Sequence, residues 1–159
     1  KFGDLDFPCA LGRSGIVATK REGDGGTPEG RFALRELHWR ADRLSTPATA
    51  LRRRLIARSD GWCDAPSDPA YNRPVALPYR ASAETLWRDD HLYDLLVPLG
   101  YNDEPVVPGA GSAIFFHLAD EKDGELGATE GCVALRLADM LALLARVAPA
   151  TEMEIALAA

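Results

Sequence analysis

The chain has 159 residues, of which 47% are hydrophobic and 26% are charged, and its formal net charge is -6 at pH 7. This length and composition predict one globular domain over residues 1–159 with its own hydrophobic core. The negative net charge argues against nucleic acid or an anionic membrane surface as a partner, because both require a basic face. The only basic cluster, residues 52–54, is interpreted as a solvated surface.

No membrane-spanning segment is expected from the sequence. The most apolar stretch, residues 140–147, is interrupted by Arg146 and falls far short of the roughly 20 residues that a spanning helix needs. The cysteines are Cys9, Cys63 and Cys132, and an odd count leaves at least one of them free. In an oxidising compartment Cys9 could pair with Cys63, which would leave Cys132 as the free thiol.

In chain order, five strands are predicted, over residues 14–20, 31–37, 94–101, 113–118 and 152–158, of which the second and the last alternate apolar and polar residues. The fourth, AIFFHL, is apolar enough to be a central strand. The last of these strands is expected to close the sheet.

Other segments are predicted to be loops or helices. Residues 20–32 are rich in glycine and predict a loop, and residues 61–79 predict an ordered irregular segment with many aromatic residues and prolines. Helices are expected over residues 47–57, over 83–88 with Ser82 as the N-cap, and over 135–147, where leucines recur at helical spacing. The fold class that follows is mainly β with a few helices, arranged as a sandwich or an open barrel.

One pair of residues could carry chemistry. His117 ends the apolar strand, and Cys132 follows it by fifteen positions, a length in which a strand, a loop and a returning element can bring the side chains together. A thiol beside an imidazole can lose its proton, and the thiolate is a nucleophile. Gly131 would let the backbone N–H groups of this loop approach a carbonyl oxygen and form an oxyanion hole. The alternative is that Cys132 is a small core residue and His117 a buried structural histidine.

Neither a metal nor a nucleotide is expected. The sequence has no Cys-x-x-Cys, and none of the three histidines is spaced with another as a metal-binding pair. The segment GDGGTP at residues 23–28 lacks the Lys-Ser/Thr ending of a phosphate-binding loop. We therefore expect a reaction without a cofactor.

From about Cys9 to its end, the chain resembles the catalytic domain of the L,D-transpeptidases, the YkuD-like family. A glycine-rich segment with Thr-Pro and Gly-x-Phe, and a strand ending in histidine followed by Ser/Thr-x-Gly-Cys, are shared with that family. The order and spacing of six motifs carry the resemblance: GDGGTPEGRF (23–32), YNRPV (71–75), LYDLLV (92–97), GYND (100–103), GSAIFFH (111–117) and TEGCVAL (129–135).

The resemblance implies a YkuD-like fold and a role for each matching residue. Cys132 would be the nucleophile that forms a thioester with a peptidoglycan stem peptide, and His117 would be its general base. Gly131 and Cys132 would supply backbone donors to the oxyanion, and Thr129 would shape the loop. The far nitrogen of His117 would be oriented by a backbone carbonyl or by a carboxylate such as Asp120 or Glu130.

The chain departs from the commonest form of the family motif at two positions. Many members read Ser-His-Gly-Cys followed by an apolar residue and arginine, whereas Glu130 and Ala134 stand at the second-histidine and arginine positions here. Other groups could bind the substrate's carboxylates and line the cleft. The candidate cations are Arg13, Lys20 and Arg73, and the candidate lining residues are Tyr71, Asn72, Trp62 and Tyr93.

The resemblance implies an enzyme that cross-links stem peptides, mainly 3→3 between diaminopimelate residues and alternatively 1→3. The same residues could instead serve an L,D-carboxypeptidase that trims stems with water, or the fold could be a non-catalytic cell-wall-binding domain. Carbapenem-type β-lactams are expected to acylate Cys132. Cell-wall chemistry places the protein in the periplasm, with a signal peptide already removed from a chain that starts at Lys1.

Overall fold

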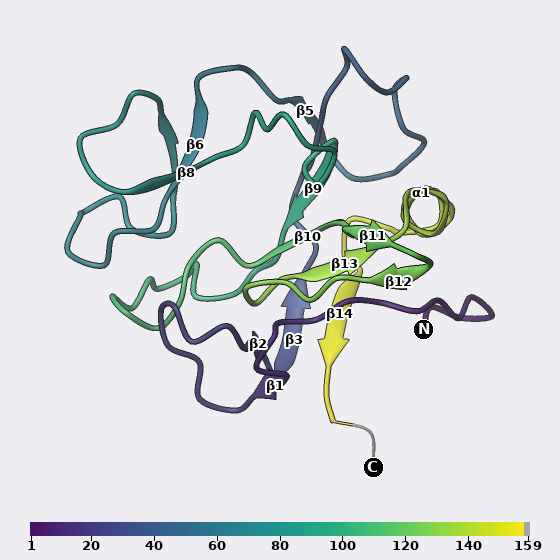
Figure 1. Cartoon of the computed structure of the whole chain (residues 1–159), viewed down its shortest axis with the longest axis horizontal. Coiled ribbons are helices and arrows are strands. Elements are labelled where there is room, and N and C mark those ends of the chain that lie inside the picture. The colour runs from purple at the N-terminus through teal and green to yellow at the C-terminus, as the bar shows by residue number, and fades with distance from the viewer. Residues whose placement is uncertain (158–159) are drawn as a thin grey trace.

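A computed structural model describes residues 1–157, and short strands dominate it, with one short helix in that range (Figure 1). The expectation of a mainly β fold is therefore confirmed. Its largest sheet has five strands, in the order β13 (Val133–Leu135), β10 (Phe115–Leu118), β9 (Leu95–Pro98), β4 (Leu37–Trp39) and β5 (Arg53–Leu55). The outer pairs β13–β10 and β4–β5 are parallel, and the inner pairs are antiparallel.

Both faces of this sheet are covered, which explains why its central strands read as continuous apolar runs. Every residue of β9 and β10 is buried. On one face the sheet packs against α1 (Leu137–Leu144), which inserts Met140 and Leu144 at 0% exposure. On the other face a second apolar cluster includes Leu86, Tyr93, Phe115 and Cys132.

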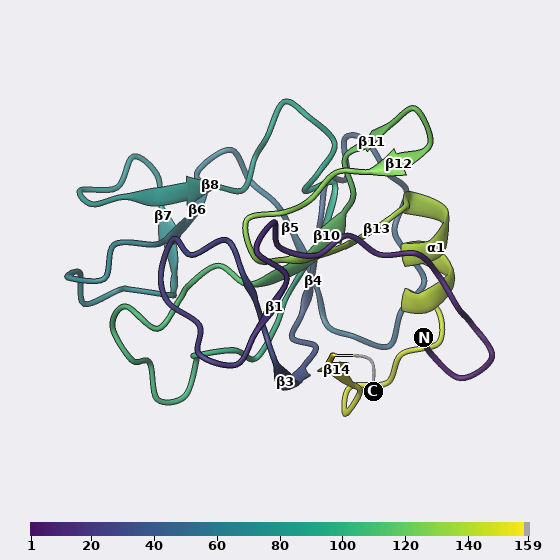
Figure 2. The ribbon, with the colours of Figure 1, turned by 60° about the horizontal axis from the view of Figure 1, so that its bottom comes forward.

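A second, three-stranded antiparallel sheet stands next to this second cluster. Its order is β7 (Pro74–Ala76), β6 (Asp60–Cys63) and β8 (Ala83–Thr85). Figures 1 and 2 place it at the opposite end of the molecule from α1. The ring of Trp62 in β6 meets the edge of Phe115 in β10 at a centroid distance of 5.3 Å, and this contact ties the two sheets together.

Three strand pairs complete the fold. They are β1 (Ile16–Val17) with β2 (Thr27–Pro28), β3 (Gly30–Ala33) with β14 (Glu152–Ile155), and β11 (Glu121–Lys122) with β12 (Glu125–Leu126). In the described part of the chain, no helix has the length and apolar character needed to cross a membrane.

Two predicted helices are wrong, and both are replaced by strands. Residues 47–57 form a loop and then β5, because pairing with β4 overrides the helix propensity of the arginines, leucines and alanines there. Residues 83–88 begin with β8, which pairs with β6, and Ser82 caps no helix. The helix expected over residues 135–147 is confirmed as α1, although Leu135 belongs to β13.

The strand predictions are confirmed in part. The expected strand over residues 31–37 is divided, because β3 pairs with β14 while β4 enters the large sheet. The last strand therefore pairs with β3 outside the large sheet instead of closing it, and Ala158 lies outside the described residues. The segment expected to be irregular, residues 61–79, contains most of β6 and all of β7.

Candidate active site

The parallel pairing of β10 and β13 brings His117 and Cys132 to the same face of the sheet. In this pairing Phe116 lies opposite Val133, and Cys132 directly precedes Val133. Because side chains alternate along strands, Phe116 and Val133 point to the α1 side, and the residues next to them point to the other side. The intervening residues contain the β11–β12 hairpin, which allows the chain to return parallel to β10.

Both residues line one cavity of about 400 Å³. Its other lining residues are mostly polar and come from several distant segments: Glu22, Asp64, Glu84, Arg88, Leu92, Tyr93, Ser112, Ala113, Asp120, Gly127, Ala128, Thr129 and Glu130. The cavity is large enough for part of a peptide, and it places a thiol and an imidazole on the same wall.

The Cys132 thiol is bound by backbone groups, and the side chain is 8% exposed. Its Sγ donates to the carbonyl of Ala113 at 3.3 Å and accepts from the N–H of Phe115, also at 3.3 Å. Burial, together with the negative charge of Glu84, raises the pKa of this thiol to about 12. The resting state near pH 7 is therefore the protonated thiol.

The His117 imidazole is neutral, and its tautomer is set by the backbone. Nδ1 lies 2.8 Å from the carbonyl oxygen of Leu118, which can only accept, so Nδ1 carries the proton and Nε2 is the basic nitrogen. A backbone carbonyl, rather than Asp120 or Glu130, thus orients the ring. Burial lowers the pKa of His117 to about 4, and Tyr93 packs edge-on against the ring at a centroid distance of 5.2 Å.

At pH 7.5 we expect iodoacetamide to alkylate Cys132 about 100-fold more slowly than the exposed Cys9 in the same sample. Because the pKa of Cys132 is raised to about 12, its rate should rise about tenfold per pH unit up to pH 10 without a plateau. Peptide mapping by mass spectrometry after timed quenching measures both rates. A plateau near pH 7 would instead show a thiolate already formed by an ion pair with His117.

The loop around Cys132 is held by two threonines and a glycine. The carbonyl of Cys132 accepts hydrogen bonds from Thr129 Oγ1 at 2.8 Å and from Thr27 Oγ1 at 3.3 Å. The N–H of Gly131 donates to Thr129 Oγ1 at 3.2 Å, so it is already engaged. Within residues 1–157, the N–H of Cys132 donates no hydrogen bond, which leaves a free donor directly beside the thiol.

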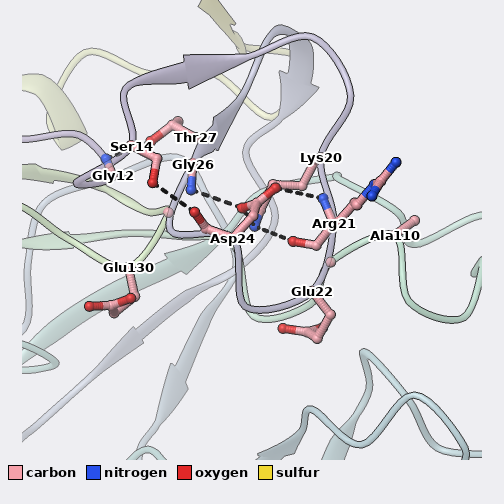
Figure 3. A network of polar contacts seen from close by, with 12 residues as sticks. Gly12, Ser14, Lys20, Arg21, Glu22, Asp24, Gly26, Thr27, Ala110 and Glu130 are labelled. Atoms are coloured by element: carbon pink, nitrogen blue, oxygen red, sulfur yellow. Dashed lines mark hydrogen bonds and ion pairs between the residues drawn. The ribbon is translucent and has the colours of Figure 1, made fainter.

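The N-terminal segment and the glycine-rich loop support the same turn. Ala10 pairs with Ala134, and Gly12 pairs with Thr129. Figure 3 shows the adjoining network, in which Asp24 accepts from Lys20 and from the N–H of Gly26. Lys20 is only 8% exposed and is bound to Asp24, so this predicted substrate-binding cation is committed to holding the loop.

Three half-buried carboxylates line the cavity without an ion-pair partner in the described residues. Glu22 accepts from the hydroxyls of Tyr71 and Ser112, Glu84 accepts from Tyr93, and Asp64 Oδ1 is buried without a hydrogen-bond partner. None of the three takes part in an ion pair within the described residues. Burial raises the pKa of Glu84. Arg88 also lines the cavity, but its ion pair is with Asp90. The lining therefore holds more carboxylates than cations, and it suits a positively charged group.

The structure brings together only some of the predicted site residues. Cys132, His117, Thr129 and Tyr93 line the cavity, and Gly131 precedes the thiol. The remaining candidates do not line it: Arg13, Arg73, Tyr71, Asn72 and Trp62.

Each of these side chains outside the cavity has another contact. Arg13 pairs with Glu130 at 2.9 Å on the surface, and Arg73 donates to the carbonyl of Asp103. Asn72 accepts a hydrogen bond from Trp62 Nε1 at 2.9 Å, and Tyr71 is 2% exposed.

Sequence reasoning missed the cavity residues that lie far from Cys132 along the chain. Glu22 precedes the glycine-rich motif, Ser112 lies inside GSAIFFH, and Glu84 and Arg88 fall in a segment assigned to a helix. Ser112 and Thr27 lie within motifs that could have drawn attention to them, whereas Asp64 and Glu84 carry no such signal.

The cysteines show no disulfide in the described residues. Cys9 is exposed, while Cys63 and Cys132 are buried, and all three are free thiols. Residues 1–157 also contain no group of three or more His, Cys, Asp or Glu side chains that could hold a metal ion.

A comparison with protein families finds a match to the L,D-transpeptidase catalytic domain, YkuD, over residues 3–155. No curated protein and no solved structure matches the chain significantly. The matched range includes every strand described above and the whole cavity, so the resemblance expected from the six motifs is confirmed.

Proposed function

The chain belongs to the family of L,D-transpeptidase catalytic domains, and on this premise we propose that it cross-links peptidoglycan stem peptides through a thioester on Cys132. The family acts on peptidoglycan stem peptides. The observation that carries the proposal is the pairing of β10 with β13, with Cys132 and a neutral His117 lining one cavity.

In the first step, Sγ of Cys132 attacks the carbonyl carbon of a donor stem. The thiol pKa of about 12 and the imidazole pKa of about 4 disfavour an ion pair beforehand. The proton therefore moves to His117 Nε2 as the S–C bond forms. The oxyanion is stabilised by the free N–H of Cys132. When the C–N bond breaks, His117 returns the proton to the leaving amine, and the thioester remains.

In the second step, an amine of an acceptor stem attacks the thioester. His117 takes a proton from the amine, the S–C bond breaks, and the sulfur recovers a proton, so the bond energy of the donor is conserved without a cofactor. The main product is a 3→3 link between diaminopimelate residues, and a 1→3 link is the alternative.

The charge of the cavity supports an amine acceptor over water. Glu22, Asp64 and Glu84 line the cavity without forming an ion pair in the described residues, and Arg88, which also lines it, pairs with Asp90. An ammonium group of a stem peptide would supply the missing charge. Water is neutral and offers these carboxylates no such charge, so we rank the L,D-carboxypeptidase activity second and a non-catalytic wall-binding role last.

The test is to incubate purified disaccharide-tetrapeptide stems with the wild-type protein and with Cys132→Ala, and to analyse the products by mass spectrometry. We expect a dimer that forms only with the wild type, and fragmentation of the dimer identifies the joined residues. Trimmed monomers without dimers would establish the carboxypeptidase instead. Identical profiles for the two proteins would contradict catalysis by Cys132.

Acylation by a carbapenem tests the Cys132 thiol in a second way, which needs no acceptor stem. The β-lactam ring should open on Sγ and add its full mass to the peptide that contains Cys132, with no adduct on Cys132→Ala. Absence of the adduct from the wild type would count against an accessible nucleophile. The proposed site of action remains the periplasm, where stem peptides are found.

A further inference from the structure

We propose that Asn72 is a positioning residue for the Cys132 thiol and that it acts through the backbone of Ala113. The role of Asn72 in catalysis rests on the proposed function, but the effect of Asn72 on the thiol can be measured without turnover. Asn72 lies outside the cavity and is 3% exposed, so it cannot serve as a substrate contact.

The amide of Asn72 uses all four of its hydrogen-bonding positions. Oδ1 accepts from Trp62 Nε1 at 2.9 Å and from the N–H of Ala113 at 3.1 Å. Nδ2 donates to the carbonyls of Tyr101 at 3.1 Å and Asn102 at 2.8 Å. One side chain therefore joins β6, the loop after β9, and the segment that leads into β10.

Ala113 has a backbone conformation that needs such support. Its φ is +52°, in the left-handed region that costs an alanine about 1 kcal/mol. This conformation persists only where neighbouring contacts hold it. The hydrogen bond from its N–H to Asn72 is the polar contact of Ala113 on the side away from the thiol.

The held segment supplies both hydrogen bonds of the thiol. The carbonyl of Ala113 accepts the Sγ proton, and the N–H of Phe115, two residues later, donates to Sγ. Trp62, the other donor to Asn72 Oδ1, also packs edge-on against Phe115. Loss of Asn72 would free the Ala113 peptide to rotate, and this would change both the direction of the thiol and the energy of its proton.

The experiment compares Asn72→Ala with Asn72→Asp in a Cys9→Ser background, which removes the exposed thiol. Asn72→Asp retains oxygen acceptors for Trp62 and Ala113 and loses the Nδ2 donors, so it separates the contact with Ala113 from general destabilisation. Asp68→Ala is the matched control, because Asp68 lies in the same β6–β7 connection as Asn72 and binds Ala70 there, and Tyr79 and Arg80 after β7, without reaching Ala113.

The first readout is the pH dependence of Cys132 alkylation. For Asn72→Ala we expect the alkylation profile to shift to lower pH by at least about half a unit, because the thiol loses the carbonyl that accepts its proton. Asn72→Asp should not shift the profile to lower pH, because it keeps an acceptor for Ala113 and its negative charge favours the protonated thiol, and Asp68→Ala should keep the wild-type profile. If stems are substrates, kcat of Asn72→Ala should fall by about ten- to 100-fold with little change in KM.

Two outcomes would overturn the inference. One is a wild-type alkylation profile in Asn72→Ala, and the other is an equal shift in Asn72→Ala and Asn72→Asp. If Asn72→Ala does not fold, Trp62→Phe with Asn72→Asp replaces it: the double variant should not shift the profile to lower pH, because Ala113 retains its acceptor. A shift to lower pH there would also overturn the role. If the wild type is inactive on stems but Asn72→Ala still shows the shifted alkylation profile, the proposed function is rejected and the role of Asn72 stands.

Discussion

His117→Ala is expected to lower the rate of thioester formation by about 10³-fold, within the usual range for loss of a general base. The reason is the state of the thiol, which keeps its proton because burial raises its pKa to about 12. Without the imidazole to take that proton, attack on the donor carbonyl requires a costly free thiolate. Acylation followed by mass spectrometry, with stems or a carbapenem as the donor, measures the rate.

The pH profile provides the sharper test of this role. Burial lowers the pKa of His117 to about 4, so the acid limb of kcat/KM in the wild type should lie near pH 4 rather than near 6.5. His117→Ala should lose this limb. His91→Ala is the matched control, because His91 is exposed and contacts only the Ala119 carbonyl through its ring. Equal rates for the two variants would contradict the general-base role.

The pH dependence of folding stability is an independent test of the protonation state of His117. The unfolded chain binds the His117 proton near pH 6.5, whereas the folded chain binds it only near pH 4. The neutral imidazole therefore contributes its full stability above pH 6.5, and about 3 kcal/mol is lost as the pH falls toward 4. Urea unfolding at pH 7 and pH 4 should show a smaller loss of stability for His117→Ala than for the wild type.

Gly131→Ala is expected to reduce acylation by at least about 100-fold and to cost about 3 kcal/mol of folding stability. Gly131 has φ +138°, which an L side chain rarely adopts, and a Cβ there would lie 2.8 Å from the carbonyl oxygen of Gly26. Neither atom can move without shifting the next residue, Cys132, or the glycine-rich loop. Urea unfolding and mass-spectrometric acylation measure the two effects.

Gly124→Ala separates backbone strain from the steric clash. Gly124 also has a positive φ, +83°, but a Cβ there would meet nothing within 4 Å. It lies in the β11–β12 turn, away from the thiol, so its replacement should cost about 1 kcal/mol and leave acylation unchanged. If Gly131→Ala is acylated as fast as Gly124→Ala, the close approach of Gly131 to Gly26 does not contribute to catalysis.

Local patterns in the chain were sufficient to predict its strongest elements and to single out His117 and Cys132 as the proposed reacting pair. The apolar run before His117 predicts β10, and the leucine spacing after Cys132 predicts α1, because burial follows from hydrophobic period within one segment. The fifteen-residue spacing between His117 and Cys132 is likewise a local property, and it corresponds to a strand, a hairpin and a parallel return.

Contacts between segments that are distant in the sequence determined the remaining strands, the lining of the cavity and the protonation of the site. Residues 53–55 and 83–85 have helix-forming neighbours, yet both become strands because β4 and β6 offer unpaired backbone groups. Glu22, Asp64 and Glu84 become cavity residues through contacts that join separate segments, and Asn72 lies behind the site rather than in it. The protonation of Cys132 and His117 has the same origin, since both pKa values are shifted mainly by burial, which no short stretch of chain can provide.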